Sequence, residues 1–167
     1  MRFSVVEFST RANIASQLTT DLPTTIKDTN GIVYDGGWTN TQQAIALCDQ
    51  TLDSAIITGE SPLRYILLFT DGTPTTYGDP PVSPSSSCAD NPVPGVPNCR
   101  TEATAAANDA KSGGIQIITI AVRDSSTELD FLFTLNSTNL GFVAESFEEA
   151  ELVTDAILGE IDIPCPP

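Results

Sequence analysis

This chain of 167 residues contains no histidine. The absence excludes catalysis by Ser-His-Asp or Cys-His groups and removes the commonest protein ligand of zinc. The glycine patterns GxGxxG and GxxxxGK[ST] are also missing, which argues against nucleotide binding by those two routes. No apolar run approaches the roughly 18 residues that a membrane-spanning helix needs. Triad hydrolases, the common nucleotide-binding proteins and a membrane span are therefore not expected here.

Basic residues are scarce. Seven lysines and arginines stand against 22 aspartates and glutamates, which gives a formal net charge of −15. Nucleic acids and anionic membranes select basic surfaces, so neither is an expected partner. An acidic surface is compatible with cation binding. Apolar residues make up 40% of the chain and charged residues 17%, a composition typical of one globular domain.

The N-terminal stretch MRFSVVEFST does not have the form of a signal peptide, because Glu7 interrupts its apolar residues. The four cysteines form no CxxC pair, which argues against a zinc or thioredoxin-like site. Cys88 and Cys99 bracket a proline-rich stretch that a disulfide between them would restrain. Asn136 begins the glycosylation sequon Asn-Ser-Thr. These features favour an oxidising, extracellular or cell-surface location.

The other two cysteines differ in their expected surroundings. Cys48 falls on a predicted helix between apolar neighbours and is expected to be an ordinary buried thiol. Cys165 lies in the proline- and cysteine-containing tail at residues 161–167, and its partner, if it has one, could lie outside this chain.

Hydrophobic patterning predicts strands that alternate with helices. Predicted strands cover residues 3–8, 12–18, 65–69, 115–122 and 141–143. Predicted helices cover residues 39–55, 101–112, 129–135 and 148–158. A polar loop is expected after the second strand, and a proline-rich surface loop at residues 74–98. The domain is expected to span residues 1–160.

This order indicates an α/β fold, a doubly wound and mostly parallel sheet with helices on both faces. Ligands of such folds bind beyond the carboxyl ends of the strands. Asp71 follows the strand at residues 65–69 and lies at such an end. Its place in FTDGT resembles the DxDGT motif of aspartyl phosphatases, but Phe69 stands where the nucleophilic aspartate would be, so the covalent step is lost.

A hard-cation site is the alternative chemistry at this edge. Mg²⁺ takes oxygen ligands and keeps positions for water or for an oxygen of a partner. Asp71 and Thr73 offer oxygens after the strand, while GGWTNT offers Thr39 and Thr41 just before a helix.

The segments GGWTNTQQAI, YILLFTDGTPT and IQIITIAV resemble, in this order, the von Willebrand factor A domain, and the resemblance runs from Phe3 to about Gly159. It implies a doubly wound sheet with one antiparallel edge strand and a metal-ion-dependent adhesion site. In that site Thr39 and Asp71 would be metal ligands. The cation of the complete domain would be Mg²⁺ or Mn²⁺.

One element of the family's metal site is absent. The motif DxSxS, expected after the family's first and central strand, does not occur, and Asp21, Asp28 and Asp35 do not begin one. The resemblance therefore implies that residues 3–8 form the family's second strand and that the sheet has a gap. An N-terminally truncated chain is favoured over a degenerate domain without metal. Cation binding by this chain is expected to be weak or absent.

The function implied by the resemblance is a non-enzymatic, extracellular adhesion module. It would capture a protein or matrix ligand through an acidic residue of that ligand, with Trp38, Thr41 and Thr73 as candidate ligand contacts. The alternative is a metal-free structural or assembly domain. Simpler roles are also open for the site residues: Asp71 as a turn residue, and Thr39 as the N-cap of its helix.

Overall fold

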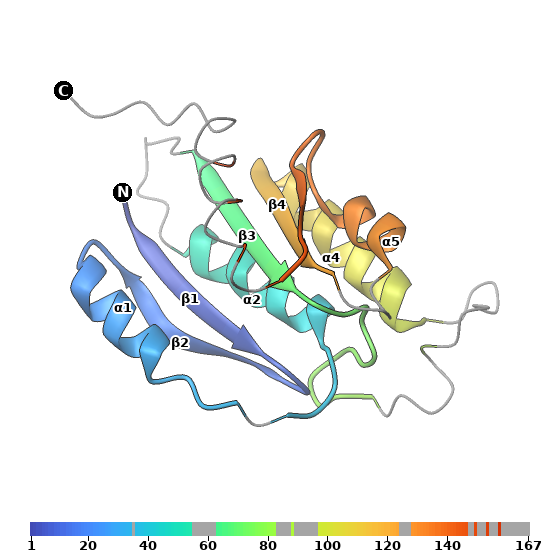
Figure 1. Ribbon diagram of the computed structural model, residues 1–167, viewed down its shortest axis with the longest axis horizontal. Helices are drawn as coiled ribbons and strands as arrows, with labels where there is room; N and C mark the ends of the chain where they lie inside the picture. The colour runs from blue at the N-terminus through green and yellow to red at the C-terminus, as the bar shows by residue number, and fades with distance from the viewer. Residues whose placement is uncertain are drawn as a thin grey trace.

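The computed structural model describes residues 1–34, 36–54, 63–82, 88, 97–123, 128–146, 149, 153 and 157 (Figure 1). Within these residues the strands form two sheets, one of two strands and one of three, and α-helices pack against them.

The N-terminal sheet is a hairpin. β1 (Phe3–Phe8) pairs antiparallel with β2 (Ala12–Thr19), and Glu7 lies opposite Asn13 in the ladder. The bounds of β1 agree with those predicted from its run of β-branched and aromatic residues. The turn between the strands is held by a hydrogen bond of 2.9 Å from Ser9 N to Arg11 O.

The segment after β2 corrects the sequence analysis, which expected a polar loop there. It forms α1 (Leu22–Asn30), which begins at the N-cap Asp21. The Asp21 carboxylate accepts hydrogen bonds from Thr24 N at 3.3 Å and from Thr24 Oγ1 at 2.7 Å, and these bonds lower the pKa of Asp21. Pro23 stands in the first turn, where a missing N–H costs nothing. The helix has no apolar stripe in its sequence, because Thr25 is its one buried residue. Its N-cap is therefore the main sequence signal for it.

The second sheet is parallel. β3 (Arg64–Thr70) pairs with β4 (Ile115–Val122) from Arg64 opposite Ile115 to Thr70 opposite Ala121, and β4 pairs in turn with β5 (Gly141–Ala144). The connecting helices are α4 (Cys99–Ser112) and α5 (Leu129–Leu135), and α2 (Thr41–Asp53) precedes β3. These elements agree with the predicted ones to within two residues at the ends that are described.

Two apolar clusters lie on the two faces of the parallel sheet. The first packs Ile66 and Leu68 of β3 against Ile45 of α2 and the alanines of α4. The second packs Ile118 and Ile120 of β4 against Val153 and Ile157. Val153 and Ile157 are helical and Glu149 is a turn residue, while the other residues of the helix predicted at 148–158 lie outside the described part of the chain. Cover on both faces confirms the doubly wound α/β class.

The sheet is divided, as the family resemblance implies. Among the described residues, no ladder joins β1 to β3, although α2 packs against both strands. The expected gap therefore falls between β1 and β3.

The predicted disulfide is present. Cys88 and Cys99 are bonded, with their Cα atoms 5.0 Å apart, and the bond anchors the loop before α4 to the first residue of that helix. Residues 74–82 of the predicted proline-rich loop contain neither helix nor strand, and most of its remaining residues and Cys165 lie outside the described part. No helix within the described ranges is long and apolar enough to cross a membrane.

Candidate functional site

The carboxyl end of β3 carries the first part of the site. Thr70 is buried at the last position of the strand, and its hydroxyl closes the turn that follows. Thr70 Oγ1 donates to Gly72 O at 3.1 Å and accepts from Gly72 N at 3.3 Å. This local turn presents Asp71 at the surface.

The segment before α2 carries the second part and lies directly against that turn. Thr39 N donates to Thr75 Oγ1 at 2.8 Å, and the Thr39 carbonyl accepts from Thr75 N at 2.9 Å and from Thr76 N at 3.3 Å. A Cβ placed on Gly72 would lie 3.8 Å from Thr39 Oγ1, so the Thr39 hydroxyl faces the turn that contains Asp71. The structure thus brings the two predicted metal ligands to one edge.

Asn40, which the sequence analysis did not single out, organises this edge. It is fully buried and is the N-cap of α2, with Oδ1 accepting from Gln43 N at 3.1 Å. Its Nδ2 donates to the carbonyls of Thr10 and Gly78, each at 3.1 Å. The pattern Asn-x-x-Gln at residues 40–43 is a helix-start signal that could have identified it.

The cap assignment also settles the simpler role considered for Thr39. Since Asn40 caps α2, Thr39 precedes the cap and its hydroxyl is not used to begin the helix. The N-cap hypothesis for Thr39 was therefore wrong.

The glycines before Thr39 allow a close approach to the β1–β2 turn. Gly36 and Gly37 have φ angles of 68° and 100°, in the region that favours glycine. A Cβ on Gly37 would lie 2.4 Å from Thr10 Oγ1, and that same hydroxyl oxygen accepts from Trp38 N at 3.1 Å. Asp35 lies outside the described residues.

The three candidate ligand contacts differ in exposure. Trp38 is 42% exposed and Thr73 is partly exposed, so both can reach a partner at the surface. Thr41 is fully buried, and its Oγ1 has no hydrogen-bond partner within the described structure. A fully buried side chain does not reach the surface, so Thr41 is not suited to contact a ligand there.

The side chains at this edge offer oxygen atoms, the type of ligand that a hard cation prefers, but they are too few to fill its coordination shell. Asp71 and Thr39 offer a carboxylate and a hydroxyl, which are oxygen ligands of the type that Mg²⁺ and Mn²⁺ prefer. No group of three or more His, Cys, Asp or Glu side chains that could hold a metal is found among the described residues. Two side-chain donors fill part of an octahedral shell, and water or a ligand must supply the remainder.

The model of the von Willebrand factor type A domain (VWA) matches residues 1–156. The chain belongs to this family. A search of curated proteins found no match.

Solved structures share the VWA fold at low identity. Proximal thread matrix protein 1 from the mussel byssus is 18% identical, with a TM-score of 0.67 over 94% of this chain and 36% of that protein. The pilus adhesin SpaC from Lactobacillus rhamnosus GG is 14% identical, with a TM-score of 0.77 over 95% of this chain and 24% of the adhesin. The vWF domain of the type V pili tip protein Mfa5 from Porphyromonas gingivalis is 14% identical, with a TM-score of 0.72 over 99% of this chain and 82% of that domain. This VWA chain therefore spans about a third or less of the first two proteins.

Another structure of the mussel protein, 20% identical over 94% of this chain with a TM-score of 0.65, is described as having a zinc-occupied MIDAS motif.

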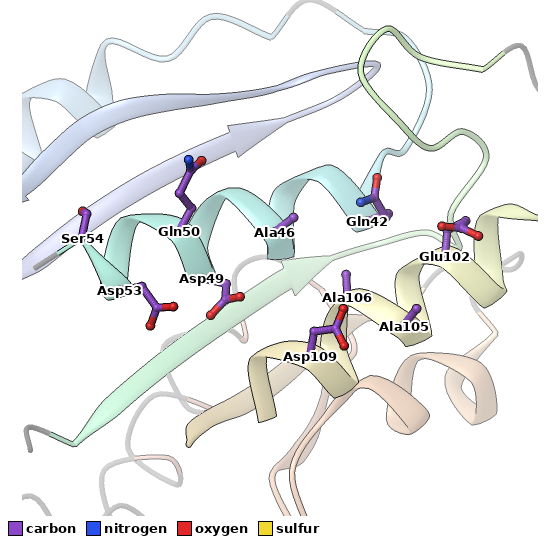
Figure 2. Close-up of a pocket in the computed structure, with 10 residues that line it drawn as sticks. All are labelled: Gln42, Ala46, Asp49, Gln50, Asp53, Ser54, Glu102, Ala105, Ala106 and Asp109. Atoms are coloured by element: carbon purple, nitrogen blue, oxygen red, sulfur yellow. The ribbon is translucent and has the colours of Figure 1, made fainter. Parts of the chain in front are cut away.

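A concave feature of this VWA domain lies between α2 and α4, a groove of about 550 Å³ (Figure 2). Asp49 and Asp53 border it from α2, and Glu102 and Asp109 border it from α4. Burial raises the pKa of the Asp49 carboxyl, and the charge of Asp53 adds to the effect. This acidic groove has no signature in the sequence, because its residues come from two helices far apart in the chain.

The glycosylation sequon of the VWA domain is built into the end of α5. With its amide oriented to satisfy both neighbours, Asn136 donates to Phe133 O and accepts from Gly141 N at 2.7 Å. Ser137 Oγ accepts from Ile117 N at 3.0 Å, and Ser137 N donates to Ile117 O at 2.8 Å. Glycosylation of Asn136 stays a prediction.

Cys48 was expected to be a buried thiol and is partly buried. It lies beside the core cluster on the α2 face, and its thiol is free. Burial raises its pKa to about 11. The thiol is thus held in its protonated, poorly nucleophilic form at neutral pH.

Proposed function

We propose that this chain is a non-enzymatic binding module that captures a protein or matrix ligand through a divalent cation at the Thr39–Asp71 edge. Mg²⁺ or Mn²⁺ is the expected cation. An acidic side chain of the ligand takes one of the coordination positions that the protein leaves open.

One observation carries the proposal: Thr39 is hydrogen-bonded through its backbone to the segment that follows Asp71. Thr75 and Thr76 hold both backbone groups of Thr39, and Asn40 performs the helix capping. The Thr39 hydroxyl is then directed to the turn at Gly72 rather than into the helix. A preorganised oxygen beside a strand-end carboxylate is what a small hard cation requires.

Asp71 and Thr39 would hold the ion, and the ion, when bound, would supply the positive charge that attracts a ligand carboxylate. One carboxylate and one neutral hydroxyl compensate only one of the two positive charges of the cation, which favours an anionic ligand. The same scarcity of protein donors makes the affinity of this chain for the cation low. Trp38 and Thr73 flank the edge and would contact the ligand around its acidic residue.

The setting of the proposed ligand is extracellular or at a cell surface. The Cys88–Cys99 disulfide supports an oxidising compartment. The structural relatives support it as well, since SpaC is a pilus adhesin and the mussel protein belongs to the byssus.

Trp38 provides the test, because it is the single tryptophan of the chain and adjoins Thr39. Mn²⁺ is paramagnetic and quenches nearby fluorescence, so a titration with MnCl₂ should quench Trp38 with a midpoint in the millimolar range. Excess Mg²⁺ should reverse the quenching by competition. Asp71→Asn, which keeps the shape of the side chain, should abolish the saturable part of the response.

Asp79→Asn is the matched control, because it removes the same charge from an exposed position of the same loop. It should leave the titration unchanged. Quenching that survives Asp71→Asn, or that both variants weaken equally, would place the cation elsewhere and contradict the proposed site. A chain that shows no saturable response in millimolar Mn²⁺ would contradict cation-dependent capture by residues 1–167.

A further inference from the structure

The groove between α2 and α4 carries acidic side chains on both of its sides. Asp49 and Asp53 extend from α2 toward α4, and α4 contributes Glu102 and Asp109 (Figure 2). Asp53 is paired with Arg64. Among the described residues, the other three carboxylates form no hydrogen bond or salt bridge, and the described lining contains no lysine or arginine. Three negative charges therefore face the groove without a paired cation from the described part of the chain.

The charges of the groove act on one another. Burial raises the pKa of the Asp49 carboxyl, the charge of Asp53 adds to the effect, Arg64 opposes it, and the charge of Asp109 raises the pKa further. Asp109 belongs to α4, so its effect on Asp49 crosses the groove. A positive charge placed between Asp49 and Asp109 would turn this repulsion into attraction.

The carboxylates are spread along the groove rather than gathered at one point. Asp49 and Asp53 are four residues apart, about 6 Å along the axis of α2, and Glu102 and Asp109 are about 10 Å apart along α4. No group of three or more acidic side chains that could hold a metal occurs within the described ranges. The spacing therefore does not fit a single metal ion, but it fits several positive charges that repeat at helical intervals.

The rest of the lining is largely apolar and small. Ala46 of α2 and Ala105 and Ala106 of α4 line the groove together with the acidic residues, and Ala46 and Ala105 are exposed. Short side chains leave this hollow open and allow another backbone to come near, since the distance between packed helices depends on the side chains at their contact. The groove therefore suits a helix that presents small apolar residues.

We propose that the α2–α4 groove binds a helix of a partner protein that carries a row of lysines or arginines beside small apolar residues. The small residues rest on the alanines, and the cations pair with Asp49, Glu102 and Asp109. Charge complementarity favours this partner over a second copy of the chain, because each copy has a net charge of −15 and the same acidic groove. The contact needs no divalent cation, so it is separate from the Thr39–Asp71 edge.

Fluorescence anisotropy with a labelled peptide tests the groove. The probe is a peptide of alanines with lysine at every fourth position, about 15 residues long so that its helix is stable enough to form. Its lysines repeat at about 6 Å, the spacing of Asp49 and Asp53. The 167-residue chain should bind it saturably in EDTA, which removes any contribution from a divalent cation. A control peptide of the same composition, with its lysines grouped at one end, should bind at least about fivefold more weakly.

Paired double variants check the location by charge. Asp49→Asn with Asp109→Asn should weaken binding of the probe by about fivefold, the effect of two exposed ion pairs. Asp79→Asn with Asp130→Asn removes the same two charges from exposed positions outside the groove. At about 0.1 M salt, where distant charges are screened, this control should bind the probe as the unmodified chain does.

A second pair of variants checks the location by shape. Ala105→Leu fills the groove without changing the charge, and leucine is a good helix former, so the fold should be kept. It should weaken binding of the probe by at least about fivefold. Asn108→Leu adds the same side chain at an exposed position of α4 that does not line the groove, and it should leave binding unchanged.

Any of five results would overturn the proposal. No saturable binding of the probe would contradict it directly. Equal affinity for the two peptides, or equal loss in the two double variants, would reduce the effect to general attraction by an acidic protein. Unchanged binding in Ala105→Leu would place the peptide outside the groove. Displacement of the probe by spermine at the same concentration of positive charge would mean that the groove takes a small polyamine rather than a helix.

Discussion

Thr39 and Thr75 are joined by two reciprocal hydrogen bonds. Thr39 N donates to Thr75 Oγ1 at 2.8 Å, and Thr75 N donates to Thr39 O at 2.9 Å. The pair fastens the segment that enters α2 to the segment that leaves β3. Binding of one ligand by both Thr39 and Asp71 depends on these two hydrogen bonds, because no helix or strand contains both residues.

Removing the Thr75 hydroxyl should loosen this junction. Thr75→Val keeps the branched shape and the Thr75 N–H but leaves Thr39 N without its acceptor. The free energy of unfolding should fall by about 1 kcal/mol, the usual loss for one hydrogen bond. Urea unfolding measures the change, and Thr75→Ser, which retains the hydroxyl, should recover most of it. Equal stability of Thr75→Val and the unmodified chain would show that water replaces the bond at no cost.

Asn40 is expected to be the most sensitive polar residue of the edge. Asn40→Ala removes the cap of α2 and leaves the carbonyls of Thr10 and Gly78 without their donor. The expected loss is about 2–3 kcal/mol, more than a cap alone contributes.

The matched comparison for this variant is Asn98→Ala, which removes the N-cap of α4, where the cap bonds are local. Its loss in urea unfolding should be about 1 kcal/mol. If the two alanine variants lose equal stability, the bonds from Asn40 to Thr10 and Gly78 contribute nothing.

Hydrophobic periodicity predicted the buried helices and strands, because a buried element has apolar residues at regular positions in its sequence. β4 has one exposed residue in eight, so its run of β-branched residues fixed both of its ends. α1 was missed because Thr25 is its one buried residue, which leaves no apolar stripe to detect. The sequence features that indicate this helix are Asp21 at the N-cap and Pro23 in its first turn. Asp and Pro are equally common in β-turns, so these two residues do not distinguish a helix from a loop.

The position of the candidate site could be predicted from the sequence, but the hydrogen bonds that hold its segments together could not. The sequence places Asp71 just beyond the carboxyl end of a strand, where the structure also has it, and the family resemblance adds Thr39. Asn40 and Thr10 were missed because their bonds join residues 30 positions apart, and no spacing in the sequence encodes that contact. The strand gap was expected from the resemblance, whereas the exposed Leu67 beside it required the structure.

Gly36 and Gly37 provide a matched pair of substitutions. Alanine at either position is strained because both φ angles are positive, at a cost of about 1 kcal/mol. At Gly37 the added Cβ would also lie 2.4 Å from Thr10 Oγ1, whereas at Gly36 its nearest contact, the Tyr34 hydroxyl, is 3.9 Å away. Gly37→Ala should therefore lower the thermal midpoint clearly more than Gly36→Ala. Equal shifts would mean that Thr10 moves aside freely and does not fix the loop.

Because of Asp49, the folded state should be destabilised when the pH rises from acidic to neutral. Burial, and then the charge of Asp53, raise the pKa of Asp49 in the folded state above its ordinary value of 3.8. The folded state then binds more protons than the unfolded state, so the free energy of unfolding falls as pH rises through the folded-state pKa. At neutral pH the free energy of unfolding is lowered by the full cost of ionising Asp49 in the folded state, and below pH 3.8 that cost is absent.

Asp49→Asn should consequently raise the thermal midpoint at neutral pH and lose that advantage below pH 3.8. The gain should be modest, because solvent screens a carboxylate at the rim of the α2–α4 groove. Asp79→Asn controls for the general relief of removing one negative charge from a chain of net charge −15. A gain as large in Asp79→Asn, or one that persists in acid, would show that net charge or helix propensity, rather than the surroundings of Asp49, is responsible.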